Sequence, residues 1–95
     1  MIFEYRLVKV KDIYISPGVF QLLRTVDYCE LEDFTERLKA KAFKKNISAA
    51  FDPPVVMHTQ RGFSALSGWN KVEWAKKTSE PELYAIVAEP EELPA

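Results

Sequence analysis

The stretch Phe63-Ser64-Ala65-Leu66-Ser67-Gly68-Trp69-Asn70-Lys71 decides the fold, because it predicts a β-strand that runs directly into an α-helix. Residues 63–66 predict the strand, which follows a turn signal. Gly68 allows a tight turn, and Ser67 can cap the helix that follows, from about Trp69 to Lys77. Apolar residues recur at helical spacing within that helix and predict its buried face.

The same strand–turn–helix is a candidate anion site. The first N–H groups of a helix have no partner within the helix, and the helix dipole favours negative charge there, so phosphate binds readily. Gly68 lets a ligand approach the backbone, Asn70 adds a neutral donor, and Lys71 adds a positive charge about one turn into the helix. The alternative is that Ser67 caps an ordinary helix and Gly68 only turns the chain.

Working outward, the residues before this stretch predict a hairpin. Val55–Thr59 reads as a strand, and Gln60-Arg61-Gly62 reads as a tight turn into the strand at 63–66. Asp52-Pro53-Pro54 separates this hairpin from another predicted strand, Asn46–Phe51, because proline cannot donate to a sheet ladder.

The clearest helix precedes these strands. Asp27 and Glu30 have the spacing of a capping box. Acidic residues fill the first half of this helix and basic residues its second half, which complements the helix dipole. The basic residues in the second half of the helix therefore have a structural explanation, which competes with a functional role for them. The face of the helix is apolar at helical spacing through Tyr28, Leu31, Phe34, Thr35, Leu38 and Ala42.

The two ends of the chain predict the remaining elements. Residues 5–15 are rich in β-branched and aromatic residues and predict a strand, whereas residues 20–24 predict a loop or a short extended piece. Residues 83–88 predict the last strand. The element order is therefore β-α-β-β-β-α-β, an α+β fold with a mixed sheet and two main helices on one side. We expect one domain over 1–88 and a flexible acidic tail over 89–95.

Composition narrows the class of protein. Ninety-five residues, 47% of them hydrophobic, support one core. Cys29 is the only cysteine, which excludes an intramolecular disulfide, and no apolar run reaches the length of a membrane span. Charges occur within the first six residues, unlike a signal peptide, so we expect a cytoplasmic protein without a membrane partner.

Charge is unevenly distributed along the chain. The first 79 residues hold all 13 basic residues and nine acidic ones, and the last 16 hold the other five acidic residues. A mildly basic body permits a nucleic-acid or phosphate partner, although a mixed solvated surface gives similar counts.

Five segments then occur in an order and spacing that one known family shares. They are Arg24, Asp27–Leu38, Ala42–Ile47, Phe63–Ala75 and Leu83–Val87. From Arg24 to Val87, about two thirds of its length, the chain thereby resembles the ParB N-terminal domain, whose fold is shared with sulfiredoxin. The resemblance implies a ParB/sulfiredoxin-like fold that binds DNA or a nucleotide phosphate beside the Gly68 turn.

The chain also departs from that family. Lys71 stands where the family's G-x-x-R motif has arginine, which removes a bidentate phosphate contact. Trp69 replaces an acidic residue, and no cysteine lies between Gly68 and Lys71, so sulfiredoxin-type reductase chemistry is not expected. We therefore expect binding rather than catalysis, with no catalytic residue, metal or cofactor.

Three hypotheses follow. The first is a module that binds nucleic acid or nucleotide phosphate through Arg24, Lys44, Lys45, Gly68, Trp69, Asn70 and Lys71. The second is a catalytically silent interaction domain that forms homo-oligomers or other contacts through Trp74 and the acidic tail. The third is a small nuclease or phosphotransferase that uses a carboxylate of Glu73, Asp52 or Glu30.

Three other residues carry weaker predictions. His58, the only histidine, falls in a strand without a second ligand at metal spacing, so we expect no metal site there. Arg61, at the hairpin turn, is either a phosphate contact or a polar turn residue. We expect Trp69 to pack in the core and Trp74 to be the more exposed tryptophan, suited to stacking on bases or to a dimer contact.

Overall fold

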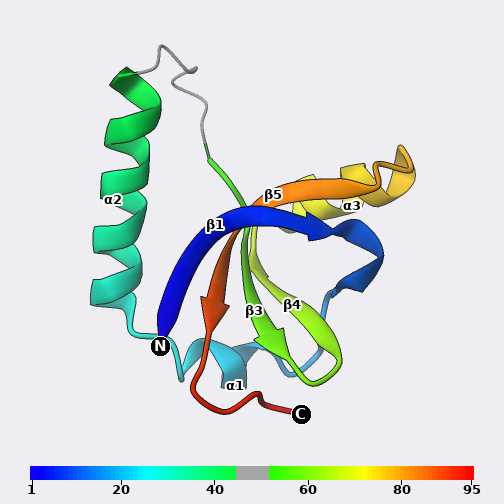
Figure 1. The fold of residues 1–95 in the computed structure, drawn as a ribbon. Helices are drawn as coiled ribbons and strands as arrows, with labels where there is room; N and C mark the ends of the chain where they lie inside the picture. Colours follow the sequence, from blue (N-terminus) through cyan, green and yellow to red (C-terminus); the bar gives the residue numbers. More distant parts are fainter. Residues whose placement is uncertain (45–51) are drawn as a thin grey trace.

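The computed structural model describes residues 1–44 and 52–95, and only the backbone of residues 43 and 44. Within these ranges the chain is an α+β fold with a five-stranded mixed sheet (Figure 1). The strands are β1 (Ile2–Lys9), β2 (Ile13–Tyr14), β3 (Val55–Thr59), β4 (Gly62–Ser67) and β5 (Glu82–Glu89). The helices are α1 (Val19–Leu23), α2 (Tyr28–Lys44), α3 (Trp69–Lys77) and the short 3-10 helix η1 (Val10–Asp12). The strand predicted at 46–51 lies outside the described residues.

The strand order in the sheet is β1-β5-β3-β4-β2. Antiparallel pairs are β1 with β5 and β3 with β4, and parallel pairs are β5 with β3 and β4 with β2. The predicted hairpin is confirmed, with Thr59 opposite Gly62 and a bulge between Val55 and Val56. The sheet is therefore mixed, as the element pattern predicts.

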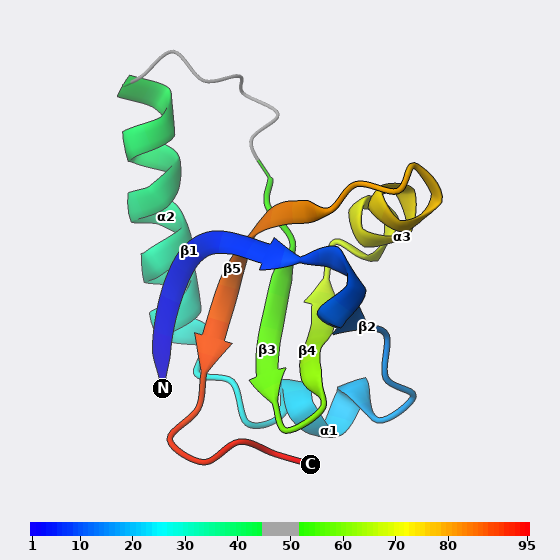
Figure 2. The ribbon, with the colours of Figure 1, turned by 45° about the vertical axis from the view of Figure 1, so that its right-hand side comes forward.

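Helices cover both faces of the sheet, so the prediction of helices on one side is wrong. Alternate residues of each strand point to opposite faces. On one face, Val56, Ala65 and Val87 pack with Val72 of α3. On the other face lies a second cluster whose strand members include Met57 and Ile86 and whose helical members come from α1 and α2. Figure 2 shows α2 on the left beside β1, α3 on the right, and α1 beside the β3–β4 turn.

The N-terminal segment differs from its prediction in two places. The single strand expected over 5–15 is divided by η1 into β1 and the two-residue β2. Residues 20–24, expected to be a loop or extended, mostly belong to helix α1, which buries Val19 against the sheet. A five-residue helix carries too few turns for a periodic pattern, which explains why the sequence does not reveal it.

Strand β5 extends through Glu89, one residue beyond the predicted domain boundary. Gln60 then donates two hydrogen bonds to the tail, from its backbone N–H to the Pro94 oxygen at 2.9 Å and from its side chain to the Leu93 oxygen at 3.1 Å. The last residues are thus docked beside the hairpin turn. Among the described residues, no helix is long and apolar enough to cross a membrane.

The capping residue of α2 is confirmed. The Glu30 backbone N–H donates to Asp27 Oδ1 at 3.1 Å. Asp27→Ala should lower the free energy of unfolding by about 1 kcal/mol, because that N–H loses its partner. Urea unfolding measures this, and Ser67→Ala is the control, because Ser67 makes no capping bond to α3. Equal destabilisation by the two substitutions would contradict the assignment.

Candidate functional site

The N-terminus of α3 is built differently from the prediction. Gly68 is its N-cap residue at φ 72° and no side chain caps the helix, so Ser67, the last residue of β4, does not act as the cap. A Cβ on Gly68 would lie 2.6 Å from Pro54 Cβ. Glycine is therefore required here by a close approach within the protein as well as by its left-handed backbone.

Lys71 is held against the segment before β3. Its Nζ donates a hydrogen bond to the Asp52 carbonyl oxygen. A lysine ammonium has three N–H donors, so it can bond to more than one partner. This contact joins the start of α3 to the segment before β3, and Lys71 also lines a surface groove.

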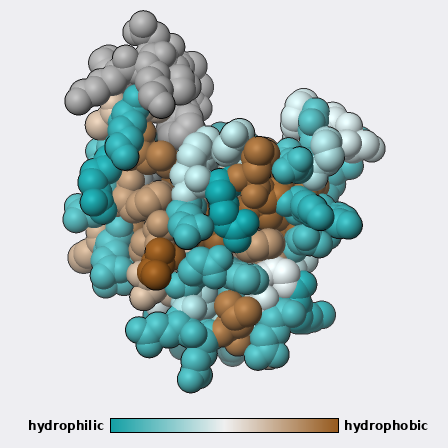
Figure 3. Space-filling view, in the orientation of Figure 1, coloured by the Kyte–Doolittle hydropathy of each residue, from teal (hydrophilic) through white to brown (hydrophobic). Residues whose placement is uncertain are grey.

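Two adjoining hollows of about 490 and 320 Å³ form this groove, and both are lined by Lys71 and Leu83. We call the pair the α3 groove. Its other lining residues are Tyr5, Leu7, Asp52, Pro53, Pro54, Asn70, Trp74, Glu82 and Tyr84. Figure 3 shows hydrophobic residues on this face over the first part of β5, beside α3. An apolar groove with a few convergent polar groups is the usual form of a ligand site.

The aromatic residues of the α3 groove are exposed. Trp74 is 61% exposed and Tyr84 52% exposed, so the prediction that Trp74 lies at the surface is confirmed. Trp69 is 41% exposed, and the expectation that it packs in the core is wrong. Its indole N–H donates to the Ala65 carbonyl oxygen at 2.8 Å, which anchors the ring on β4, and Trp69 does not line the α3 groove.

Tyr5 and Tyr84 form a stacked pair at one end of the groove. Their ring centroids are 5.2 Å apart and their planes differ by 21°. Burial raises the pKa of the Tyr5 phenol above its ordinary value, and the neighbouring Tyr84 raises it further. The phenol of Tyr5 therefore stays neutral at any physiological pH and can both donate and accept hydrogen bonds.

The raised pKa of Tyr5 predicts an alkaline loss of stability. Above about pH 10 the phenol ionises in the unfolded chain while it remains protonated in the folded one, so the unfolded state binds fewer protons. The contribution of Tyr5 is fully present below that pH and is lost as the pH rises through the folded-state pKa. Tyr5→Phe should flatten this part of the stability profile, measured by urea unfolding across the alkaline range. A profile unchanged by the substitution would contradict the assignment.

The seven predicted site residues are not brought together. Gly68, Trp69, Asn70 and Lys71 lie in the first turn of α3, and of these Asn70 and Lys71 line the α3 groove. Arg24 is the C-cap residue of α1, which lies beside the hairpin turn and at the far end of β4 from α3 (Figure 2). Lys44 is the last residue of α2, and only its backbone is described. Lys45 lies outside the described residues.

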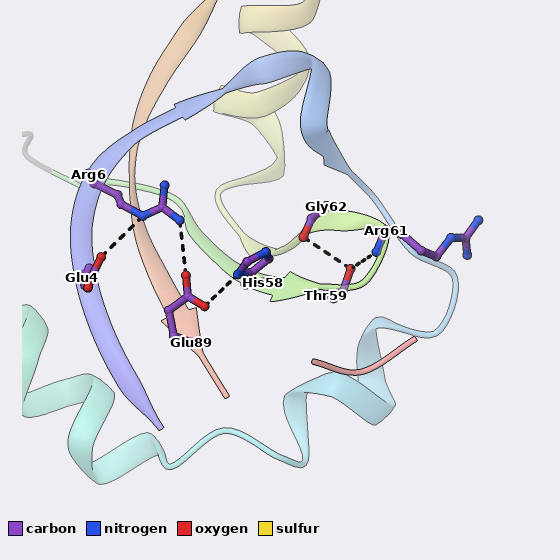
Figure 4. A network of polar contacts seen from close by, with 7 residues as sticks. All are labelled: Glu4, Arg6, His58, Thr59, Arg61, Gly62 and Glu89. Atoms are coloured by element: carbon purple, nitrogen blue, oxygen red, sulfur yellow. Dashed lines mark hydrogen bonds and ion pairs between the residues drawn. The ribbon is translucent and has the colours of Figure 1, made fainter. Parts of the chain in front are cut away.

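A second polar cluster lies on the sheet (Figure 4). Glu89 accepts from Arg6 at 3.3 Å and pairs with His58 Nδ1 at 2.8 Å, and Arg6 also contacts Glu4 at 3.5 Å. The Phe63 ring packs against this cluster. The His58 ring stacks on it with the two ring centroids 4.9 Å apart, and the Arg6 guanidinium carbon lies 5.2 Å from the Phe63 centroid. His58 is thus a strand residue with a carboxylate partner. Sequence reasoning missed the cluster because Arg6 and Glu89 are 83 positions apart.

The hairpin tip is held by Thr59. Its buried hydroxyl lies 2.7 Å from the Tyr14 hydroxyl and accepts from the Arg61 backbone N–H at 3.1 Å. The Arg61 guanidinium lies 5.7 Å from the centre of the Tyr14 ring. Arg61 is therefore positioned by contacts within the protein, at the opposite end of β4 from the α3 groove.

The described residues contain no group of three histidine, cysteine or carboxylate side chains arranged to hold a metal ion. No protein-family model matches the chain, and a search of curated proteins finds no match to it. The resemblance to the ParB N-terminal domain therefore stays a prediction. The structure itself defines an α+β fold with a mixed sheet and the α3 groove.

Proposed function

We propose that this chain is a ParB-like binding module for nucleic acid, and that a single strand lies in the α3 groove. The observation that carries the proposal is the shared wall of that groove, where Asn70 and Lys71 lie beside the exposed ring of Trp74. The resemblance of the Phe63–Ala75 segment to a phosphate-binding motif supports the same ligand class.

Single strands suit this groove for a physical reason. Proteins that bind them without strong sequence preference combine aromatic rings, on which bases stack, with cations that contact the backbone. Trp74 and Tyr84 offer exposed rings, and the ammonium group of Lys71, with three N–H donors, can contact a phosphate oxygen in addition to the Asp52 carbonyl. A duplex keeps its bases stacked on one another, so it cannot use these rings.

The charges around the groove limit the electrostatic share of binding. Asp52 and Glu82 also line it, so Lys71 is accompanied by two acidic residues. Each phosphate contact on a single strand contributes about 0.7 to the slope of log affinity against log salt concentration. We therefore expect a small slope, near that of one or two contacts, and an affinity that depends mainly on stacking.

A titration tests the proposal. A fluorescently labelled single strand and a duplex of the same sequence are titrated with the protein at low salt, and anisotropy reports binding. The single strand should bind more tightly, with the shallow salt dependence described above. Absence of binding to the single strand, or tighter binding to the duplex, would contradict the proposal.

A further inference from the structure

Strand β1 is an edge strand of the sheet, and α2 packs on the face that carries its Phe3 and Tyr5. It is eight residues long and pairs along its whole length with β5, from Ile2 opposite Glu89 to Lys9 opposite Glu82. It is last in the strand order, and no described strand pairs with its outer side (Figure 1). Such an edge presents a row of backbone donors and acceptors that can pair with another chain. The strand contains no proline, and it exposes 66% of Ile2 and 42% of Leu7.

The sequence of β1 is complementary to itself when reversed. In an antiparallel pair of two copies centred on Tyr5, Ile2 faces Val8, Phe3 faces Leu7, and Glu4 faces Arg6. Each of these contacts occurs twice because of the two-fold symmetry. Directly opposed residues of antiparallel strands lie close enough for their side chains to contact, and opposite charges there are favourable.

We propose that two copies of this chain associate through antiparallel pairing of their β1 strands, in the register that places Tyr5 opposite Tyr5. The edge pairing forms a continuous ten-stranded sheet with no unpaired β1. The occupant is a second copy because the register that joins the apolar pairs is the same one that joins Glu4 to Arg6. An unrelated peptide would match the backbone but would have no reason to match this alternation of charge and apolar residues.

The charged side chains that the register joins are available at the surface, as are Ile2 and Leu7, whereas Val8 is buried within its own chain. The side chains of Arg6 and Glu4 are 39% and 55% exposed. Arg6 contacts Glu4 and Glu89 within its own chain, and its guanidinium carries five N–H donors, so it can also reach the carboxylate of a second copy. On the opposite face, Phe3 and Tyr5 pack only partly against the cluster beneath α2, which leaves apolar area for the partner's Leu7.

Charge reversal tests the register. Glu4→Arg places like charges opposite one another at two places across the two-fold axis, and so does Arg6→Glu. Each variant alone should dimerise at least about tenfold more weakly than the original chain. A mixture of the two variants should dimerise again, because every reversed residue then faces an opposite charge. The double variant Glu4→Arg/Arg6→Glu should also dimerise with itself.

Light scattering coupled to size-exclusion chromatography measures the mass of each sample against the 10.9 kDa chain. Circular dichroism shows whether each variant is folded. Where Arg6→Glu does not fold, Arg6→Gln takes its place in the mixture, because a neutral side chain facing the introduced arginine also removes the repulsion. A monomeric original chain, or single variants that dimerise as well as it does, would overturn the proposal. So would a mixture that stays monomeric. Neither Glu4 nor Arg6 lines the α3 groove, although Tyr5 and Leu7 belong to both surfaces, and the mass of the particle reports dimerisation without any nucleic acid present.

Discussion

Gly62→Ala is expected to lower the free energy of unfolding by about 2–6 kcal/mol, since a strained backbone and an overpacked contact each cost about 1–3 kcal/mol. Gly62 begins β4 at φ 127°, a conformation that residues with a Cβ rarely adopt. An added Cβ would lie 2.5 Å from the Asp12 carbonyl oxygen. That oxygen belongs to the backbone of η1 and can move only if η1 shifts away from the hairpin.

Gly18→Ala is the matched control for this effect. Gly18 has φ −90°, and the nearest atom to an added Cβ is Ser16 Oγ at 3.6 Å, an ordinary contact distance. Urea unfolding of the two variants compares them directly, and Gly18→Ala should stay within about 1 kcal/mol of the original chain. If both variants were equally stable, the close packing of the hairpin on η1 would be wrong.

Trp74→Ala is expected to weaken single-strand binding by about 1–3 kcal/mol, or roughly 5- to 150-fold, which is the usual contribution of one base stacked on an aromatic ring. Trp74 is exposed on α3 and lines the groove beside Asn70 and Lys71. The substitution removes an exposed ring on which a base can stack and leaves no cavity in the core, so the free energy of unfolding should change little.

Phe20→Ala is the matched control for Trp74→Ala. Phe20 is an aromatic residue that is 73% exposed on α1, away from the α3 groove. Lys71→Ala should also weaken binding, because it removes the lysine that lines the groove, and its matched control is Lys77→Ala, an exposed lysine of the same helix outside the groove walls. Anisotropy titrations should show loss of affinity in the two groove variants alone. Equal losses in the control variants would indicate diffuse binding to the whole surface.

Local features of this fold were predictable from the sequence. The Asp27 cap, the hairpin around Gln60-Arg61 and the start of α3 at Trp69 each depend on residues within a few positions of one another. Helix α1 was missed because five residues carry no clear period. The placement of helices on both faces was missed because it depends on which strands become neighbours, and β1 pairs with β5 from the other end of the chain.

The candidate site was predictable only in part, for the same reason. The sequence identifies Asn70, Lys71 and the exposure of Trp74, which belong to one short helix. It cannot show that Pro54 packs against Gly68 or that Lys71 bonds to Asp52, because these contacts join segments that are distant in sequence. Those two contacts bring the segment Asp52-Pro53-Pro54 to the start of α3, where it forms part of the α3 groove.

The most direct test of the α3 groove uses the fluorescence of Trp74 itself. In a Trp69→Phe variant Trp74 is the only tryptophan, and a base stacked on its indole should quench its emission. Titration with an unlabelled single strand should quench Trp74 in a saturable way, with the same affinity as the anisotropy titration. In the converse Trp74→Phe variant, the emission of Trp69 should change little. Saturable binding that leaves Trp74 emission unchanged would contradict the proposed role of the groove.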